Sequence, residues 1–472
     1  MLDKNLALMT DSYKAGHAPL YKPGTGYVHS YFESRGGLFP RNLFFGMQYY
    51  LKEFLVGSVV TKQHVEEATE FWTGHFGRSD YFNPDLWMYI VDERDGCLPL
   101  SIKSAPEGTV VPTSNVLFTI ENTDPNCYWL VNWLETLLSK LWYTTSVASS
   151  SYYIKRDILS QLEISGDVSG IDFKCHDFAY RGVTSEEQAA LGAAAHLLSF
   201  KGTDTVAGIR LLQKYYDAPM CGFSIPATEH SIMCSFGKDN EHDAIRNLLT
   251  QHPSGMIACV SDTYDIFHCC RELWGKEFRD EVINRDGCVV IRPDSGDPKQ
   301  VVIKCLNILW DKFGGTKNDK GYFVLDPHVR MIQGDGMNRN TIIDLYKFIV
   351  ANGYSADNLA VGSGGGLLQD VNRDTCKFAI KASAVGDRYG EINHNVAKSP
   401  ITDIGKRSKE GQLKLVYDQT ERRYKTVSSM NQSEYFYATN TLVETFRDGE
   451  LTHECTYDDI LEQIDLSVHI TS

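Results

Sequence analysis

The sequence lacks the features that mark membrane and nucleic-acid-binding proteins. No apolar run approaches the roughly 20 residues that a membrane-spanning helix needs. Residues 1–5 lack the charged-then-apolar layout of a secretory signal. There is no excess of basic residues either, because the formal net charge is −15, which argues against an extended surface for nucleic acid. We therefore expect a cytoplasmic protein that binds neither membranes nor nucleic acid.

Paired cysteine motifs are also absent. The twelve cysteines are scattered singly, apart from the adjacent Cys269 and Cys270, and none has the Cys-x-x-Cys spacing of zinc and redox sites. A disulfide framework suits small secreted proteins, whereas this chain has 472 residues. We expect free and mostly buried thiols. Sequence repeats of 20 to 50 residues and low-complexity tracts are missing as well, which excludes repeat architectures.

Length and composition indicate a globular protein with more than one core. A chain of 472 residues exceeds the size at which a single hydrophobic core keeps growing, and 42% of its residues are apolar. Residues 1–165 have mixed patterns, with strands expected at 27–32 and 108–112 and a helix at 127–143. Residues 390–472, which contain a basic segment at 398–409, are expected to complete this mixed α/β domain.

Between residues 166 and 389 a short apolar strand, a polar or glycine-rich turn and an amphipathic helix recur. The expected strands are 174–178, 222–226, 256–260, 288–291, 329–332 and 359–361, and the expected helices are 184–198, 266–274, 299–313 and 341–350. Strands that alternate with helices pair in parallel, in a barrel or a doubly wound sheet. Because polar residues follow nearly every strand, and a barrel gathers such positions on one face, we favour an irregular (β/α) barrel.

The loop Gly362-Ser363-Gly364-Gly365-Gly366 is suited to hold a phosphate. Glycines between a strand and a helix let backbone N–H groups approach an anion, which the helix N-terminus also favours. The loop has neither the Lys-Ser/Thr ending of a P-loop nor the spacing of a dinucleotide fingerprint, and a tight turn without a ligand is the alternative. Arg373 shortly downstream favours phosphate, at a position where late barrel loops commonly bind one.

Charged residues recur on the neighbouring loops, at Arg292, Asp294 and Asp335. The guanidinium group of arginine donates two hydrogen bonds to phosphate oxygens, and carboxylates accept hydrogen bonds from sugar hydroxyls. Each aspartate, with Asp262 and Asp265, also suits a capping or turn role. Their recurrence on successive loops favours a shared function.

His230 and the segment around Phe178 are further candidates. His230 follows a predicted strand and is either catalytic or a hydrogen-bonded structural residue. A metal-ligand role is not favoured, because no second histidine or cysteine has a convincing metal-ligand spacing. The face of Phe178 suits a flat heterocycle, and Asp204 would accept a hydrogen bond from an amide. Phe178 and Tyr180 also suit the core, and for Tyr180 we accept that interpretation.

Taken in order, these motifs resemble the type II phosphoribosyltransferase family, and within it the enzymes that use nicotinamide. The resemblance runs nearly end to end, through residues 10–14, 30–33, 201–208, 291–296, 362–369 and 406–409. It implies transfer of the 5-phosphoribosyl group from phosphoribosyl pyrophosphate to nicotinamide, giving nicotinamide mononucleotide and pyrophosphate in NAD salvage. It further implies Mg²⁺ held mainly by the substrate pyrophosphate, ATP as a coupling substrate, and a homodimer with active sites at the subunit interface.

The resemblance also implies residue roles. The nicotinamide site would comprise Tyr13 of a second subunit, Phe178, Arg181 and Asp204. The ribose and phosphate would lie against Arg292, Asp294, Gly334, Asp335, Gly364, Gly365 and Arg373. The pyrophosphate and ATP side would comprise Arg35, His230, Asp265, Lys381, Lys398 and Lys406. The resemblance places the catalytic work on His230, which ATP would phosphorylate, and on Asp262, Arg292 and Asp294.

Two residues depart from the family pattern, and three other functions stay open. Ala179 and Ala379 replace an expected glycine and serine, and neither removes a charge. A nicotinate enzyme is the nearest alternative, but Asp204 would repel the substrate carboxylate. An inactive barrel that acts as a binding protein would not need this charged set. A barrel aldolase or metal-dependent lyase would need a metal triad, which we do not find.

Overall fold

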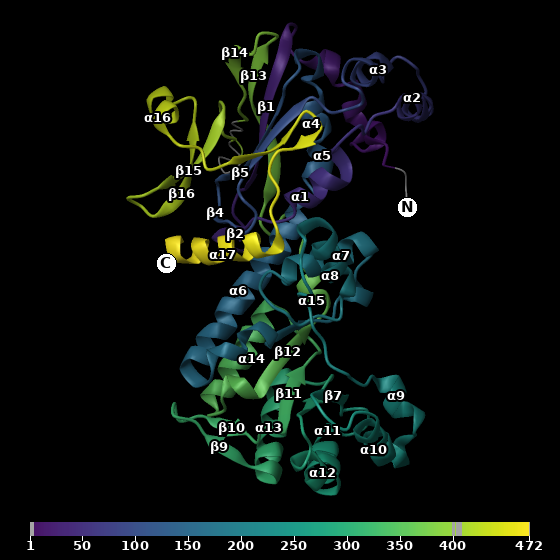
Figure 1. The fold of residues 1–472 in the computed structure, drawn as a ribbon, viewed down its shortest axis with the longest axis vertical. Helices are drawn as coiled ribbons and strands as arrows, with labels where there is room; N and C mark the ends of the chain where they lie inside the picture. Colours follow the sequence, from purple (N-terminus) through teal and green to yellow (C-terminus); the bar gives the residue numbers. More distant parts are fainter. Residues whose placement is uncertain (1–3, 399–401, 403–407, 472) are drawn as a thin grey trace. The chain divides into compact units, whose positions relative to one another are not determined.

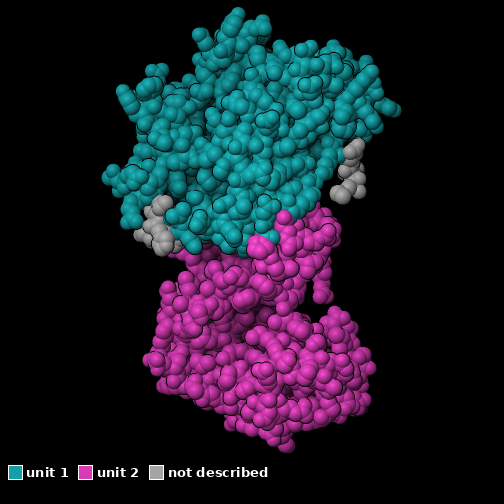
Figure 2. Space-filling view, in the orientation of Figure 1, with its two compact units in different colours: residues 1–149, 214–218, 372–472 teal, residues 150–213, 219–371 magenta. Residues whose placement is uncertain are grey.

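The computed structural model describes residues 4–398, 402 and 408–471 (Figure 1). The chain divides into two compact units, which Figure 2 colours separately. Unit 1 contains residues 1–149, 214–218 and 372–472, and unit 2 contains residues 150–213 and 219–371. All twelve cysteines are free thiols, as predicted. In the described part of the chain, no helix has the length and apolar character needed to cross a membrane.

Unit 1 is built on an antiparallel sheet with the order β14-β13-β1-β5-β3-β17-β18. Its strands are β1 Thr25–Ser34, β3 Leu100–Ser104, β5 Val116–Asn122, β13 Phe378–Asp387, β14 Ile392–Asn395, β17 Val443–Arg447 and β18 Glu450–Leu451. On β1, the Phe32 ring stacks between Phe118 and Phe378, with 5.0 Å between ring centroids on each side. This stack joins the adjacent strands β13, β1 and β5, which come from both ends of the chain.

Smaller elements complete unit 1. Two strand pairs are β2 Arg41–Leu43 with β4 Val110–Pro112, and β15 Leu413–Asp418 with β16 Arg423–Ser428. The helices are α1 Met47–Tyr50, α2 Lys62–Phe76, α3 Pro84–Glu93, α4 Leu130–Trp133, α5 Glu135–Leu138, α16 Gln432–Tyr437 and α17 Tyr457–Thr471. The strands predicted at 27–32 and 108–112 are therefore confirmed in β1 and β4.

The continuous helix predicted at 127–143 is wrong, because this stretch is broken into α4, α5 and the start of α6. Two carbonyls that a continuous helix would use internally are bonded by side chains instead. Lys14 Nζ donates to the carbonyl of Asn132 at 2.7 Å, and Thr10 Oγ1 donates to the carbonyl of Trp133 at 2.9 Å. These tertiary bonds interrupt the helical ladder at a position that apolar spacing cannot reveal.

Unit 2 is built on a parallel sheet with the order β6-β12-β11-β8-β7. The strands are β6 Cys175–Asp177, β7 Ile257–Val260, β8 Val289–Arg292, β11 Val329–Gln333 and β12 Leu359–Ser363. In Figure 1, α13 and α14 run alongside these strands. Each strand overlaps a predicted one, and the chain is a mixed α/β protein as predicted.

Helices follow most of these strands. They are α6 Leu141–Ser165, α7 Glu186–His196, α8 Val206–Tyr216, α9 His230–Ser235, α10 Glu241–Gln251, α11 Ile266–His268, α12 Arg279–Ile283, α13 Pro298–Phe313, α14 Arg339–Ala351 and α15 Gly365–Leu368, and the hairpin β9 Gly315–Lys317 and β10 Phe323–Leu325 lies between α13 and β11. Asn338 is the N-cap of α14 and forms a reciprocal capping box with Thr341.

The strand predicted at 222–226 is wrong as a regular strand. Only single parallel bridges occur there, from Phe223 to Gly202 and from Ala227 to Ala258. Pro226 has no N–H to donate to a ladder, and its carbonyl accepts from the N–H of Ala258 at 2.9 Å. The segment therefore lies beside its neighbours without a continuous ladder.

Lys174 anchors the beginning of β6. It is 9% exposed, and its Nζ donates to the carbonyls of Ala356, Asp357 and Leu359 at 3.0 to 3.1 Å. Burial lowers the pKa of this lysine to about 8, against the opposing effect of the Asp357 charge. One buried cation thus joins the chain before β6 to the loop before β12.

Replacing Lys174 with Met should lower the free energy of unfolding at pH 7 by about 2 kcal/mol, because three buried carbonyls lose their donor. Between pH 8 and pH 10.5 the unfolded lysine holds its proton more tightly than the folded one, so this lysine makes wild-type stability rise with pH there. Urea unfolding at several pH values measures both effects. The exposed Lys62→Met change on α2 is the control, and equal stability of the two variants would contradict the anchoring role.

Candidate functional site

Phe178 lies directly after β6 in a seat made by two glycines. Its N–H donates to the carbonyl of Ser363 at 2.9 Å, at the end of β12. A Cβ atom on Gly362 would overlap the Phe178 ring, and one on Gly334 would lie 3.6 Å from it. The ring also packs against a small core cluster of Ala258, Cys288, Val290 and Ile332. The ends of β6, β11 and β12 therefore position one aromatic face.

Arg292 ends β8 beside this ring. Its guanidinium carbon lies 5.7 Å from the centre of the Phe178 ring, and Nη2 donates to Asp294 Oδ2 at 3.4 Å. The Asp294 Oδ1 atom would lie 3.0 Å from a Cβ on Gly334, so only glycine fits there without displacing the carboxylate. The Arg292 Nε atom is buried without a partner among the described residues. A cation, a carboxylate and an aromatic face thus meet at the carboxyl ends of β6 and β8.

His230 and two carboxylates form a second group next to the first. Asp262 Oδ1 lies 3.1 Å from His230 Nε2, and Asp262 Oδ2 accepts from the N–H of Asp294 at 2.9 Å and from the Ser295 hydroxyl. His230 Nδ1 lies 4.0 Å from Asp294 Oδ2. The Asp262 side chain is 4% exposed, whereas that of His230 is 44% exposed. A buried acid therefore orients an accessible imidazole.

Asp204 is fixed by two side chains that were not among the predicted site residues. His176 Nε2 lies 3.0 Å from Asp204 Oδ1, and the Ser224 hydroxyl donates to the same oxygen at 2.5 Å. Burial tends to raise the pKa of Asp204, but the bonds from His176 and Ser224, with the charge of Arg292, hold it below its ordinary value. His176 and Phe178 have ring centroids 4.8 Å apart, which places Asp204 next to the aromatic face.

The remaining predicted residues of unit 2 lie on exposed loops and turns. Arg181 is on the exposed turn Tyr180–Gly182, and Asp335 lies on the exposed loop after β11. Gly364 and Gly365 begin the short helix α15. Asp265 caps α11 by accepting from the N–H groups of Phe267 and His268 at 2.9 and 3.0 Å, and these backbone bonds lower its pKa. For Asp265 the capping role considered from the sequence is therefore present.

The assignment of Tyr180 to the core is wrong. The residue is only partly buried, and its hydroxyl donates to Glu186 Oε2 at 2.7 Å on an exposed surface. A tyrosine in a short 3₁₀ turn directs its side chain by local geometry, which apolar character does not predict.

The predicted cations of unit 1 gather near Glu135 and Glu33. Lys381 Nζ lies 3.8 Å from Glu135 Oε1, whose other oxygen pairs with Lys14 at 2.7 Å. Burial lowers the pKa of Lys381, and the charges of Arg35, Lys14 and Arg373 act in the same direction. Arg35 Nε donates to Glu33 at 3.1 Å, while Arg35 Nη2 is buried without a partner among the described residues. Among the residues that the structure describes, Lys14, Lys381 and Arg35 thus have only Glu135 and Glu33 as acidic partners.

Tyr13 belongs to the same part of unit 1. Its side chain is 57% exposed, and it lines an open hollow of about 400 Å³ together with Lys14, His17, Glu135 and Lys381. Lys398 is exposed, and Lys406 lies outside the described residues. Arg373 is also exposed and belongs to unit 1, whereas the glycine loop belongs to unit 2.

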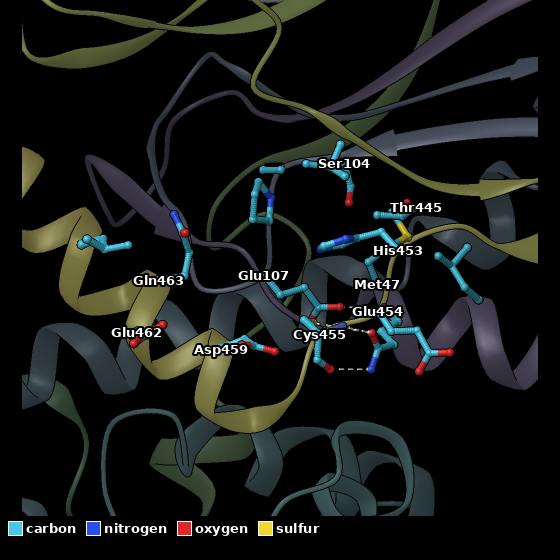
Figure 3. A pocket seen from close by; sticks show the side chains of 16 residues that line it. Met47, Ser104, Glu107, Thr445, His453, Glu454, Cys455, Asp459, Glu462 and Gln463 are labelled. Carbon is cyan, nitrogen blue, oxygen red and sulfur yellow. Dashed lines mark hydrogen bonds between the residues drawn. The ribbon is translucent and has the colours of Figure 1, made fainter.

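A second pocket of unit 1, of about 390 Å³, is lined by none of the predicted residues (Figure 3). Asp459, Glu462 and Gln463 of α17 line it opposite Ser104 and Thr445. Its buried acid, Glu107, accepts from the N–H groups of Gly46 and Gln48 at 2.6 Å each and from the Tyr216 hydroxyl. Burial raises the pKa of Glu107 to about 7. Because these polar groups satisfy one another, their arrangement is explained by folding alone.

The described residues contain no group of three or more histidine, cysteine, aspartate or glutamate side chains placed to hold a metal ion. Three further residues, His176, Ser224 and Ser295, contact the predicted site residues but were not predicted from the sequence. His176 lies within β6, Ser224 lies in the stretch predicted as a strand at 222–226, and Ser295 follows β8. Only Ser295 could have been selected by its position after a strand, and that position does not reveal which partner a side chain meets.

Comparison with known proteins identifies two matching family models. Residues 173–446 match the nicotinate phosphoribosyltransferase (NAPRTase) family, and residues 5–102 match the nicotinamide phosphoribosyltransferase N-terminal domain. The chain is 45% identical over 466 residues to a nicotinamide phosphoribosyltransferase from Xanthomonas campestris, with 98% of each chain covered. It is 31% identical to a protein of the same name from Acinetobacter baylyi, with 96% of each covered.

Solved structures with a similar fold cover almost the whole chain. A nicotinate-nucleotide pyrophosphorylase from Pyrococcus furiosus has a TM-score of 0.61 at 13% identity and covers 99% of this chain and 96% of its own. Human nicotinic acid phosphoribosyltransferase has a TM-score of 0.54 at 13% identity and covers 98% and 94%. At this identity the likeness concerns the fold.

Replacing Gly362 with Ala should displace the Phe178 ring and lower the free energy of unfolding by about 1 to 3 kcal/mol, because a methyl group would overlap the ring. A crystal structure of the variant and a urea unfolding curve measure the two effects. Gly170→Ala is the control in the same unit, since the nearest atom to its new methyl group would be 3.9 Å away. An unmoved Phe178 ring with unchanged stability would show that the glycine is not needed as a seat.

Proposed function

The chain belongs to the nicotinate phosphoribosyltransferase (NAPRTase) family, and from this premise we propose that it transfers the 5-phosphoribosyl group from phosphoribosyl pyrophosphate to nicotinamide. The products are nicotinamide mononucleotide and pyrophosphate, and the reaction serves NAD salvage. The observation that carries this function is the 45% identity over 98% of both chains to a nicotinamide phosphoribosyltransferase.

The site supports an amide-bearing base as the acceptor. Asp204 has a lowered pKa, so it is ionised near neutrality and accepts hydrogen bonds without donating them. A carboxamide N–H₂ is a suitable donor to it, whereas the carboxylate of nicotinate would be repelled. The Phe178 face, with His176 beside it, is suited to lie against the flat pyridine ring. In this proposal Arg181 assists in holding the carboxamide.

The reaction breaks the bond between C1 of the ribose and the pyrophosphate, and the ring nitrogen of nicotinamide forms the new bond to C1. Positive charge develops on the sugar, and negative charge develops on the leaving pyrophosphate. Asp294 and Asp335 are suited to hold the sugar hydroxyls, while Arg292, Gly334, Gly364, Gly365 and Arg373 are suited to the phosphate. Groups that meet the developing charges stabilise the transition state more than the ground state.

We assign the pyrophosphate side to Arg35, Asp265, Lys381, Lys398 and Lys406. In the described part of the chain the Nη2 of Arg35 is buried without a partner, and this atom and the lowered pKa of Lys381 support a cationic patch that an anion would complete. Mg²⁺ would enter with the substrate pyrophosphate and neutralise its charge. Tyr13, which is 57% exposed, is proposed to reach the base of a second subunit in a homodimer.

We further propose that unit 2 is an irregular (β/α) barrel within residues 166–389, with the second domain formed by 1–165 and 390–472. Single parallel bridges support closure, since Asp177 pairs with Thr203, Gly202 with Phe223, and Ala227 with Ala258 at the other edge of the sheet. The division into units at residues 149/150 and 371/372 supports the two-domain organisation. A closed ring would bring all of the strand ends of unit 2 to one face.

An assay with both bases tests the proposed function. Wild-type protein with phosphoribosyl pyrophosphate and Mg²⁺ should form nicotinamide mononucleotide and should use nicotinate much less well. Asp204→Asn should lower kcat/KM for nicotinamide by roughly 10- to 100-fold, because it removes a charge-assisted hydrogen bond. Asp311→Asn, an exposed change on α13, is the control. Preferred use of nicotinate would identify the alternative enzyme, and no product from either base would favour the binding-protein alternative.

We propose that ATP phosphorylates His230 and that this couples ATP hydrolysis to transfer. The accessible imidazole next to Asp262 supports the assignment, because the acid would orient the ring and leave one nitrogen for phosphate. His230→Ala should retain slow transfer and lose the stimulation by ATP, and it should lose acid-labile phosphate on the protein. Product formation with and without ATP measures the first effect, with His242→Ala on α10 as the control. An unaltered response to ATP in His230→Ala would refute the coupling.

A further inference from the structure

We infer that His176 and Ser224 are positioning residues that make the enzyme select an amide over a carboxylate, because they fix which oxygen of Asp204 faces the base. This inference rests on the proposed function. It concerns two side chains that were not assigned a role in the sequence analysis and that act through Asp204.

Both donors converge on a single oxygen of Asp204. His176 Nε2 lies 3.0 Å from Oδ1, and Ser224 Oγ donates to Oδ1 at 2.5 Å. Among the described residues Asp204 Oδ2 accepts no hydrogen bond, and half of the side chain is exposed. A carboxylate held in this way has one anchored oxygen and one free acceptor. The free acceptor, Asp204 Oδ2, is the atom that can accept a hydrogen bond from an amide N–H₂.

The backbones that carry the three residues are tied together. The N–H of Asp204 donates to the carbonyl of Asp177 at 2.9 Å, one residue beyond His176. The N–H of Phe223, next to Ser224, donates to the carbonyl of Lys201 at 2.7 Å. Because the backbones are fixed, rotation of the Asp204 side chain is the remaining freedom. The hydrogen bonds from His176 and Ser224 remove that freedom.

The surroundings leave room for the His176 ring and set the local charge. A Cβ on Gly202 would lie 2.8 Å from His176 Nδ1, so a larger residue there would displace the imidazole. The ring lies beside Phe178, with 4.8 Å between centroids. The charged or titratable groups that act on Asp204 and His176 are Arg292 and the buried His196. Arg292 favours the ionised form of Asp204, as do the two hydrogen bonds.

Loss of either donor should therefore affect the binding of nicotinamide in two ways and leave the binding of phosphoribosyl pyrophosphate unchanged. Asp204 would rotate, so fewer molecules would present a free oxygen to the amide. Its pKa would also rise, because burial would be opposed by fewer hydrogen bonds. A protonated Asp204 would accept a weaker hydrogen bond from the amide and would no longer repel a carboxylate. Binding of nicotinamide should weaken, and discrimination against nicotinate should weaken with it.

Steady-state kinetics of Ser224→Ala and His176→Phe test the inference. Each should raise KM for nicotinamide about tenfold, with kcat and KM for phosphoribosyl pyrophosphate within about twofold of wild type. The preference for nicotinamide over nicotinate should fall by a similar factor. Ser224→Thr and His176→Gln, which keep a donor, should restore most of the difference.

Ser235→Ala on α9 and His242→Phe on α10 are the matched controls, and both should behave as wild type. If Ser224→Ala and His176→Phe keep the wild-type KM and base preference, the inference is wrong while the proposed function stands. If KM for phosphoribosyl pyrophosphate rises in parallel, the two residues have a general structural role and the inference is also wrong. If wild-type protein forms no nicotinamide mononucleotide, the proposed function itself fails.

Discussion

The geometry of the site depends on the glycine seat of the Phe178 ring. Gly362 is the residue before the end of β12 and Gly334 follows β11, and side chains at either position would meet the ring or Asp294. With the ring in this seat, Arg292 lies over it and His176 lies beside it. Arg292 of β8 and His176 of β6 therefore both pack against the Phe178 ring, which fixes their positions relative to each other. Parallel strands make this possible because their carboxyl ends lie at the same edge of a sheet.

Charge is distributed unevenly in this acidic chain. The formal net charge is −15, yet unit 1 places Lys14, Arg35 and Arg373 within electrostatic reach of Lys381. Two acids, Glu33 and Glu135, form ion pairs with some of these cations. The ion pairs reduce the repulsion between the cations, so the protein can fold without a bound anion. Composition excludes a basic surface for nucleic acid, but it does not exclude a local basic patch. A small anionic ligand needs only such a patch.

The strands of unit 2 could be predicted because each combines an apolar run with a following polar loop, as in β8 and Arg292. Prediction failed where tertiary bonds override local pattern. The helix expected at 127–143 is broken by Lys14 and Thr10, more than 100 residues away in sequence. Position after a strand selected His230, and the chemistry of a carboxylate facing an amide selected Asp204, but the partners His176 and Ser224 depend on side-chain directions across different strands. Those directions are fixed only when the strands are assembled.

Asp262 joins His230 to the loop that carries Asp294. One of its oxygens contacts His230, and the other accepts from the N–H of Asp294 and from Ser295. A shift of the Asp262 carboxylate would therefore affect both the imidazole and this loop. A change of charge at His230 would act on the same carboxylate, so its effect would reach the loop through two hydrogen bonds. The proposed coupling of ATP hydrolysis to transfer would then need no movement of the strands themselves, only a change in how one buried acid shares its two oxygens.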